Sequence, residues 1–158
     1  MHLDEKWIHN EYIKKYQNIE PIKDDLKIFI NKLINITDNN LIITTGIKSN
    51  KLTEYIKIKS SIVNENISFL KKDNLKIIIC ENIEIFDLIF LISKSSLLIT
   101  CHGSPTHIAS SFNIKTIDII DNSEIGLFNK YVAHLRNYNQ ICRQSFKDLA
   151  DEIYKLLT

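Results

Sequence analysis

The sequence predicts an α/β fold: a Rossmann-like three-layer α/β/α domain with a parallel sheet, formed by residues 1–158 as a single domain. Short runs rich in β-branched residues alternate with segments whose apolar residues recur every three or four positions, the patterns of strands and amphipathic helices. This alternation continues along the chain, and strands joined by helices pair in parallel through right-handed crossovers. The length is also that of one domain.

The first half of the chain alternates helices with strands after a very short initial strand. Pro21 and Asp24 open a helix whose apolar residues keep helical spacing until Asp38 breaks it. The β-branched run before Gly46 is typical of a buried parallel strand. Trp7, the single tryptophan, is interpreted as a core anchor. The expected elements are a helix over 22–34, a strand over 41–45, a weaker helix over 51–63 and a strand over 75–80.

The second half continues the same alternation. Ser145 and Asp148 have the spacing of a capping box, with aspartate in place of the usual Glu or Gln, and an apolar stripe follows them. Residues 123–144 show no clear pattern. The expected elements are a helix over 84–95, a strand over 97–100, a turn over 101–105, a short helix over 106–112, a strand over 114–120 and the helix after Ser145.

Composition argues against several classes of function. The net charge of +1 provides no bulk field for nucleic acid, so no nucleic-acid partner is expected. The three cysteines are scattered and are expected to be reduced and mostly buried. No apolar run reaches the roughly 18 residues of a membrane span, and no secretory signal opens the chain. These features predict a cytoplasmic protein with no transmembrane segment, with peripheral attachment at the inner membrane as a further option.

The best candidate for a ligand site is the turn over residues 100–107 (TCHGSPTH). Ligands of open α/β sheets bind beyond the carboxyl ends of the strands, which places residues 4–7, 44–46, 102–107 and 121–122 on one edge. Gly103 stands where a strand turns into a helix, and Pro105 suits the first helical turn. Free amides of the turn and of Thr106, with the positive end of the helix dipole, would face an anion. The turn therefore predicts a site for a phosphorylated ligand.

Each candidate side chain also has an ordinary structural interpretation. His102 and His107 could donate to a phosphate or a sugar hydroxyl, or satisfy a neighbouring carbonyl. Two histidines without a third ligand do not suit a metal, and none is predicted. Lys6 could reach a phosphate, although a lone lysine is more often solvated. Thr44 and Thr45 are strand residues whose hydroxyls reach a ligand only if this edge is the site. The glycine-rich dinucleotide and P-loop patterns are absent.

Residues 92–109 (ISKSSLLITCHGSPTHIA) resemble the signature of glycosyltransferase family nine, the ADP-heptose:lipopolysaccharide heptosyltransferase group. That signature is a helix, an apolar strand and Asp-[Ser/Thr]-Gly-x-x-His-[Leu/Ile]-Ala opening the next helix. Residues 113–120 look like its following strand, 4–7 resemble its Lys-x-Trp-like segment, and 41–46 are similar to its next strand and glycine. The resemblance covers most of the chain but only the C-terminal half of these GT-B enzymes, the half that binds the sugar nucleotide.

The resemblance implies that Ser104, Pro105 and Thr106 lie along the diphosphate and that His107 and Lys6 lie close to it. No catalytic residue is assigned, because the acceptor-binding half has no counterpart in this chain. No cofactor is expected, since the nucleotide-diphosphate sugar is a substrate. The complete set of predicted donor- and phosphate-binding residues is Lys6, Thr44, Thr45, Gly46, His102, Gly103, Ser104, Pro105, Thr106 and His107.

One departure affects the donor. His102 stands where the family has its aspartate, and exchange of a carboxylate for an imidazole reverses the local electrostatics. A histidine could instead favour the diphosphate directly, as His-Gly turns do in other GT-B enzymes. The nature of the donor sugar therefore cannot be carried over from the family.

The leading hypothesis is the donor-binding half of an inverting, metal-independent glycosyltransferase that transfers a heptosyl or hexosyl group in lipopolysaccharide or surface-glycan synthesis. The isolated chain is expected to bind without catalysing transfer. The alternative is a non-catalytic nucleotide-sugar binding module, or a split or truncated enzyme that needs a separate N-terminal partner; a Met start inside the first strand motivates it. A third hypothesis is a GT-B-type sugar-nucleotide epimerase, which would need acidic and histidine residues across a cleft.

Overall fold

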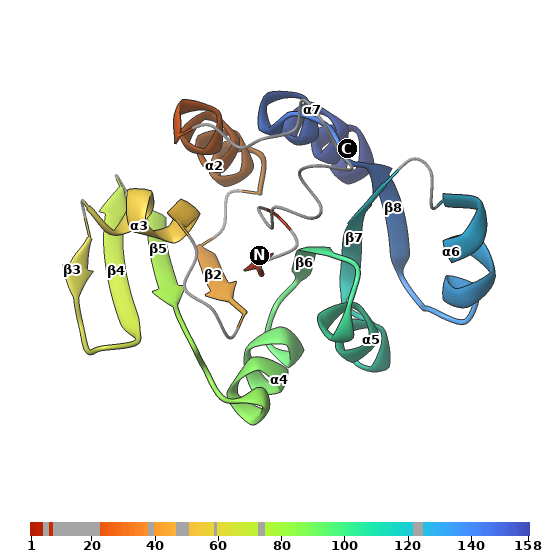
Figure 1. The fold of residues 1–158 in the computed structure, drawn as a ribbon, viewed down its shortest axis with the longest axis horizontal. Coiled ribbons are helices and arrows are strands. Elements are labelled where there is room, and N and C mark those ends of the chain that lie inside the picture. Colours follow the sequence, from red (N-terminus) through yellow and green to blue (C-terminus); the bar gives the residue numbers. More distant parts are fainter. Residues whose placement is uncertain are drawn as a thin grey trace. The chain divides into compact units, whose positions relative to one another are not determined.

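The computed structural model describes residues 1–4, 7, 23–37, 40–46, 51–58, 60–72, 75–121 and 125–158, and they form two compact units (Figure 1). The first unit combines Met1–His2 with Glu84–Arg143, and the second combines Leu3–Ile83 with Gln144–Thr158. The predicted α/β class is confirmed, and the arrangement is compatible with a Rossmann-like fold. The strands form two sheets, however, one parallel and one mixed, where the sequence predicted a single parallel sheet.

The first unit contains a parallel sheet with strand order β6-β7-β8. The strands follow one another in the chain, and a helix connects each to the next. The alternating pattern predicted the first two strands and the helix between them, whereas α6 and β8 lie within residues 123–144, where the sequence showed no clear pattern. In the second half of the chain the structure has α4 (Ile85–Ser93), β6 (Leu97–Cys101), α5 (Ser104–Ser111), β7 (Lys115–Ile120), α6 (Ile125–Val132) and β8 (Tyr138–Cys142).

One face of this sheet is apolar near the start of β6 and polar toward the ends of β6 and β7. Ile92 of α4, Leu98 of β6 and Ala109 of α5 form a buried apolar cluster, so the face that contains Leu98 is covered by α5. Thr100 is two residues further along β6 and pairs with Asp118 of β7. Since side chains alternate along a strand, both lie on the face of Leu98. Asp118 is therefore buried on the helix-covered face.

The second unit contains parallel and antiparallel strands. β2 pairs in parallel with β5, β5 pairs antiparallel with β4, and β4 pairs antiparallel with β3. The whole sheet has the order β1-β2-β5-β4-β3. Its strands and helices are β1 (His2–Leu3), α2 (Lys23–Thr37), β2 (Leu41–Thr45), α3 (Lys51–Lys57), β3 (Ser61–Ile62), β4 (Ile67–Lys72), β5 (Leu75–Cys80) and α7 (Phe146–Leu157).

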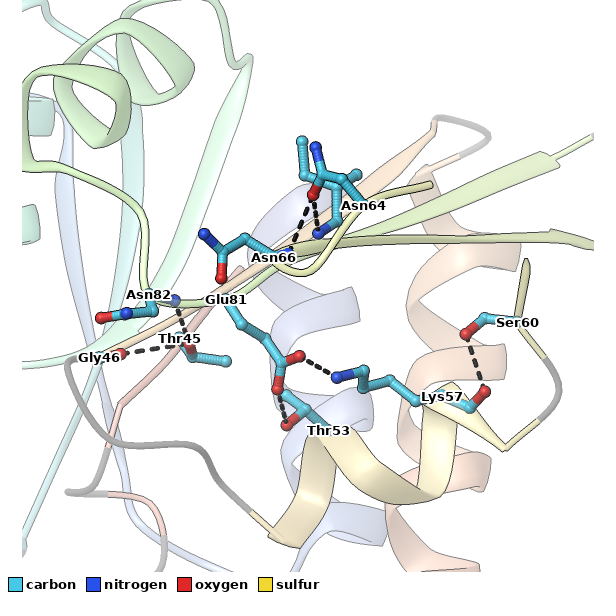
Figure 2. A network of polar contacts seen from close by, with 10 residues as sticks. Thr45, Gly46, Thr53, Lys57, Ser60, Asn64, Asn66, Glu81 and Asn82 are labelled. Carbon is cyan, nitrogen blue, oxygen red and sulfur yellow. Dashed lines mark hydrogen bonds and ion pairs between the residues drawn. The ribbon is translucent and has the colours of Figure 1, made fainter. Parts of the chain in front are cut away.

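An antiparallel hairpin begins within a predicted helix: β3 lies in its last part, and β4 follows in residues for which no element was predicted. The helix expected over 51–63 ends at Lys57, and the hairpin turn follows (Figure 2). The side-chain Oδ1 of Asn64 accepts hydrogen bonds from the backbone N–H of Asn66 at 2.9 Å and of Ile67 at 2.8 Å. An asparagine that bonds to the backbone two and three residues ahead stabilises a turn, and this local bonding competes with helix.

Three aromatic rings form the core between α2 and α7. Trp7 stacks on Phe146 with ring centroids 5.6 Å apart, and Phe29 lies 5.1 Å from Phe146. All three side chains are buried, which confirms Trp7 as a core anchor. The Ser145 hydroxyl oxygen accepts from the backbone N–H of Asp148 at 3.3 Å, so the predicted cap of the last helix is also confirmed. In the described parts of the chain, no helix has the length and apolar character required to cross a membrane.

Candidate functional site

In the turn between β6 and α5, the structure confirms the prediction for Pro105 and contradicts the one for the Thr106 amide. Pro105 lies in the first turn of α5, as expected. The backbone N–H of Thr106 donates to the carbonyl oxygen of Gly103 at 3.0 Å. This amide is used inside the turn, so the expectation that it is free for an anion is wrong. Ser104 is exposed, whereas Pro105 and Thr106 are buried.

His102 is held by a buried carboxylate. Its Nδ1 lies 2.6 Å from Oδ2 of Asp118, whose side chain is 0% exposed, while 20% of the His102 side chain is exposed. With Asp118 ionised, Nδ1 donates the hydrogen bond, and a neutral imidazole then carries its lone pair on Nε2. A carboxylate behind an imidazole fixes the orientation and tautomer of the ring. The ring of His102 is therefore positioned by the sheet.

The same carboxylate oxygen has a second donor. The Tyr138 hydroxyl donates to Oδ2 of Asp118 at 2.7 Å, and Nε2 of Gln140 donates to the Tyr138 oxygen at 3.0 Å. The network thus crosses the whole sheet, from the end of β6 through β7 to β8. The other oxygen of Asp118, Oδ1, has no hydrogen-bond partner among the described residues, and neither has the buried hydroxyl of Thr106. These atoms make the face beneath α5 unusually polar for a buried surface.

Burial and the adjacent charge of Asp118 raise the pKa of Tyr138 well above its ordinary value of 10.0, and the hydrogen bond to that carboxylate raises it further. The folded protein therefore keeps this proton at a pH where the unfolded chain releases it. Unfolding releases a proton above about pH 10, so the stabilisation is complete below that pH and is lost as the pH rises toward the folded-state pKa.

We expect Tyr138→Phe to remove this alkaline loss of stability. Between pH 10 and 11 the wild-type free energy of unfolding should fall by about 1 kcal/mol more than that of the variant, because the unfolded tyrosine is half ionised at pH 10 and mostly ionised at pH 11. Urea unfolding across this pH range measures the difference. Tyr154→Phe is the matched control, because Tyr154 is exposed, and this variant should keep the wild-type slope. Equal slopes for wild type and Tyr138→Phe would contradict the expectation.

Two further histidines continue from His102 toward the surface. The ring of His107, on α5, lies edge-on to that of His102 with centroids 5.7 Å apart. The ring of His134, after α6, stacks on His107 with centroids 5.8 Å apart and planes inclined by 19°. His107 and His134 are exposed. Among the described residues, no three histidine, cysteine or acidic side chains are arranged to hold a metal ion.

The predicted residues Thr44, Thr45 and Gly46 lie at the end of β2, in the second unit. Thr44 and Thr45 are buried. The hydroxyl of Thr45 donates to the carbonyl oxygen of Gly46 at 3.2 Å, and its oxygen accepts from the backbone N–H of Asn82 at 3.3 Å (Figure 2). These bonds connect the ends of β2 and β5, which gives Thr45 a structural role.

Glu81, directly after β5, anchors α3 to the same edge. Its carboxylate accepts from the Thr53 hydroxyl at 3.1 Å and forms an ion pair with Lys57 (Figure 2). The carboxylate is only 11% exposed. Both of its oxygens have partners on α3, and a buried carboxylate needs such partners. We interpret this group as a structural connection between helix and sheet.

The structure brings together only part of the predicted site. His102, Gly103, Ser104, Pro105, Thr106 and His107 belong to one unit, whereas Thr44, Thr45 and Gly46 belong to the other. Lys6 and Asn122 lie outside the described residues. The phosphate-binding role of these residues stays a prediction.

Sequence reasoning missed Asp118, Tyr138 and His134. Asp118 had a signal, because a lone aspartate inside the apolar run over 114–120 marks either a strand end or a buried carboxylate. Tyr138 and His134 lie in the stretch without a clear pattern, so nothing in the sequence distinguished them.

Comparison with protein-family models, with curated proteins and with solved structures finds no match to this chain. Inference about function therefore depends on the arrangement around His102 and on the sequence signature.

Proposed function

We propose that this chain is the donor-binding half of a heptosyltransferase-like glycosyltransferase that acts in lipopolysaccharide or surface-glycan synthesis. In this proposal the first unit binds the diphosphate of a nucleotide sugar at the turn between β6 and α5. The observation that carries it is the placement of His102 at the carboxyl end of a parallel strand, immediately before a helix, with Asp118 fixing its ring. Ligands of α/β proteins bind at this position.

The chemistry of the turn suits a diphosphate. The positive end of the α5 dipole and the imidazoles of His102 and His107 attract negative charge. In sugar transfer, the bond between the anomeric carbon and the phosphate oxygen breaks, and its electron pair goes to the diphosphate. Donors preorganised around that oxygen stabilise the charge as it develops. An acceptor hydroxyl must be activated by groups outside the set described here.

A non-catalytic nucleotide-sugar binding module is the second candidate, and one observation favours it. His102 occupies the family's aspartate position and is committed through Nδ1 to Asp118, so this chain lacks the acidic group that the family has there. An assay of sugar transfer distinguishes the two candidates. Transfer to an acceptor when the chain is combined with a separate acceptor-binding domain supports the enzyme; binding without transfer under those conditions supports the module.

We expect a nucleotide-diphosphate sugar to raise the melting temperature of the protein. A ligand at 100 times its dissociation constant stabilises by about 2.7 kcal/mol, or roughly 5–10 °C for a chain of this length. The measurement is a thermal-shift panel with ADP-, GDP-, UDP- and CMP-sugars. His102→Ala and His107→Ala, each compared with its own ligand-free melting temperature, should lose most of the shift.

Lys130→Ala is the matched control for loss of a positive charge, because Lys130 is an exposed residue of α6. It should keep the full shift. The assigned turn would be abandoned if His102→Ala and His107→Ala responded to the ligand as strongly as wild type.

A further inference from the structure

His102, His107 and His134 form a continuous row of imidazole rings, here called the histidine row. Adjacent ring centroids are 5.7 and 5.8 Å apart. The row begins at the end of β6, continues on α5 and ends in the connection between α6 and β8. It leads from the buried carboxylate of Asp118 to the exposed ring of His134. The turn after β6, the helix α5 and the connection after α6 therefore contribute imidazoles to one place.

The position of His134 is fixed by hydrogen bonds on its own segment. The backbone N–H of Arg136 donates to the hydroxyl oxygen of Ser110 at 2.8 Å, and Nδ2 of Asn137 donates to the carbonyl oxygen of Asn113 at 3.2 Å. Both acceptors belong to α5 or to the residues directly after it. These bonds attach the connection to the helix that carries His107, so the stacking of the two rings follows from the local backbone.

We propose that His134 is a third anion-binding side chain and that the histidine row binds the diphosphate as a unit. This inference rests on the proposed function and adds to it a residue that the family signature does not contain. Protonated imidazoles donate from both ring nitrogens and are cationic. Three cationic rings in a row repel one another, and a diphosphate beside them offsets that repulsion. Ligand binding should therefore be coupled to proton uptake by the row.

The charges around the row allow this coupling. Asp118 supplies one negative charge behind His102, and the Tyr138 phenol is neutral at the pH values considered, as an ordinary tyrosine is, because its pKa of 10.0 is only raised further. Two positive side chains flank His134 in the sequence, Lys130 and Arg136. Arg143, directly after β8, is a further positive side chain close to the row, because its guanidinium Nη1 lies 3.9 Å from Sγ of Cys101, next to His102. The remaining described charged side chains on or directly beside the elements that carry or pack against the row are Glu84, Asp87 and Lys94 in and around α4, Lys115 of β7 and Asp121 directly after β7.

The proposal predicts that anion binding tightens as the pH falls. Imidazoles gain their proton between pH 8 and pH 5, and one proton taken up on binding changes affinity by up to about tenfold per pH unit. Inorganic pyrophosphate is a suitable probe because it carries no base or sugar. It becomes less negative as the pH falls, so tighter binding at low pH cannot come from the probe. We expect at least about tenfold tighter binding at pH 6 than at pH 8.

The decisive variant is His134→Phe, measured by calorimetry with pyrophosphate at both pH values. Phenylalanine keeps a ring that can stack on His107 but has no N–H and no charge. We expect it to melt at the wild-type temperature, and the ratio of affinities at the two pH values to fall by about threefold or more. Lys130→Ala, which removes a flanking charge and no imidazole, should keep the wild-type ratio.

The outcomes separate this inference from the proposed function. A wild-type ratio in His134→Phe, or no binding of pyrophosphate to wild type, overturns the histidine row as a binding unit. If sugar nucleotides nevertheless raise the melting temperature, the proposed function stands without it. If pyrophosphate behaves as expected and no sugar nucleotide gives a shift, the row is an anion site and the glycosyltransferase proposal falls.

Discussion

Phe29→Ala is expected to lower the free energy of unfolding by about 4 kcal/mol, one of the two largest effects predicted for a single substitution in this protein. Phe29 is fully buried and contacts both other rings of the core, with centroids 6.4 Å from Trp7 and 5.1 Å from Phe146. Alanine removes the ring and leaves a cavity between α2 and α7, and rings already packed together cannot collapse to fill it.

Urea unfolding followed by circular dichroism measures this loss without using the tryptophan that Phe29 contacts. Ile28→Ala is the matched control on the same helix, because Ile28 is 40% exposed and its replacement should change stability by about 1 kcal/mol or less. A loss below that of the control would show that Phe29 does not support the core.

Asp118→Asn is expected to destabilise the protein by about 3 kcal/mol, which corresponds to a fall in melting temperature of about 8 °C. The substitution keeps the shape of the side chain and removes its charge. His102 and Tyr138 then lose the charged acceptor that both share. Hydrogen bonds to a buried charge are stronger than those to a neutral amide.

Asp87→Asn provides the control, since Asp87 is an exposed aspartate of α4 in the same unit and its change should be nearly neutral. Tyr138→Phe combined with Asp118→Asn should destabilise by less than the sum of the single changes, because both substitutions affect the same hydrogen bond between Tyr138 and Asp118. Additive effects would mean that the carboxylate and the phenol act independently.

Most helices and strands could be predicted because their residues follow a regular pattern. The β-branched run before Gly46 predicts a strand, and the apolar stripe after Ser145 predicts a helix. The structure has β2 and α7 at these places. The hairpin of β3 and β4 was missed because its outer strand is only two residues long and its turn depends on Asn64. The end of a helix and a short exposed hairpin can contain similar residues. The pairing of β4 with β5, which a sequence pattern does not reveal, is what forms the hairpin here.

The candidate site was less predictable than the fold. The sequence indicated the turn after β6 and both of its histidines, because Gly103 and Pro105 mark a strand-to-helix turn. It did not indicate Asp118 as the partner of His102, since the contact depends on which neighbouring strand lies beside β6. His134 reaches His107 only through the connection after α6. Contacts of this kind arise from topology and not from spacing along the chain.

Because the protein has a single tryptophan, its intrinsic fluorescence reports on one of the two units. Trp7 is 3% exposed and stacks on Phe146 in the second unit, whereas the histidine row lies in the first. Its emission should shift to longer wavelength when that aromatic cluster opens. Comparison of the emission midpoint with the midpoint from circular dichroism would show whether both units melt in one transition or in two.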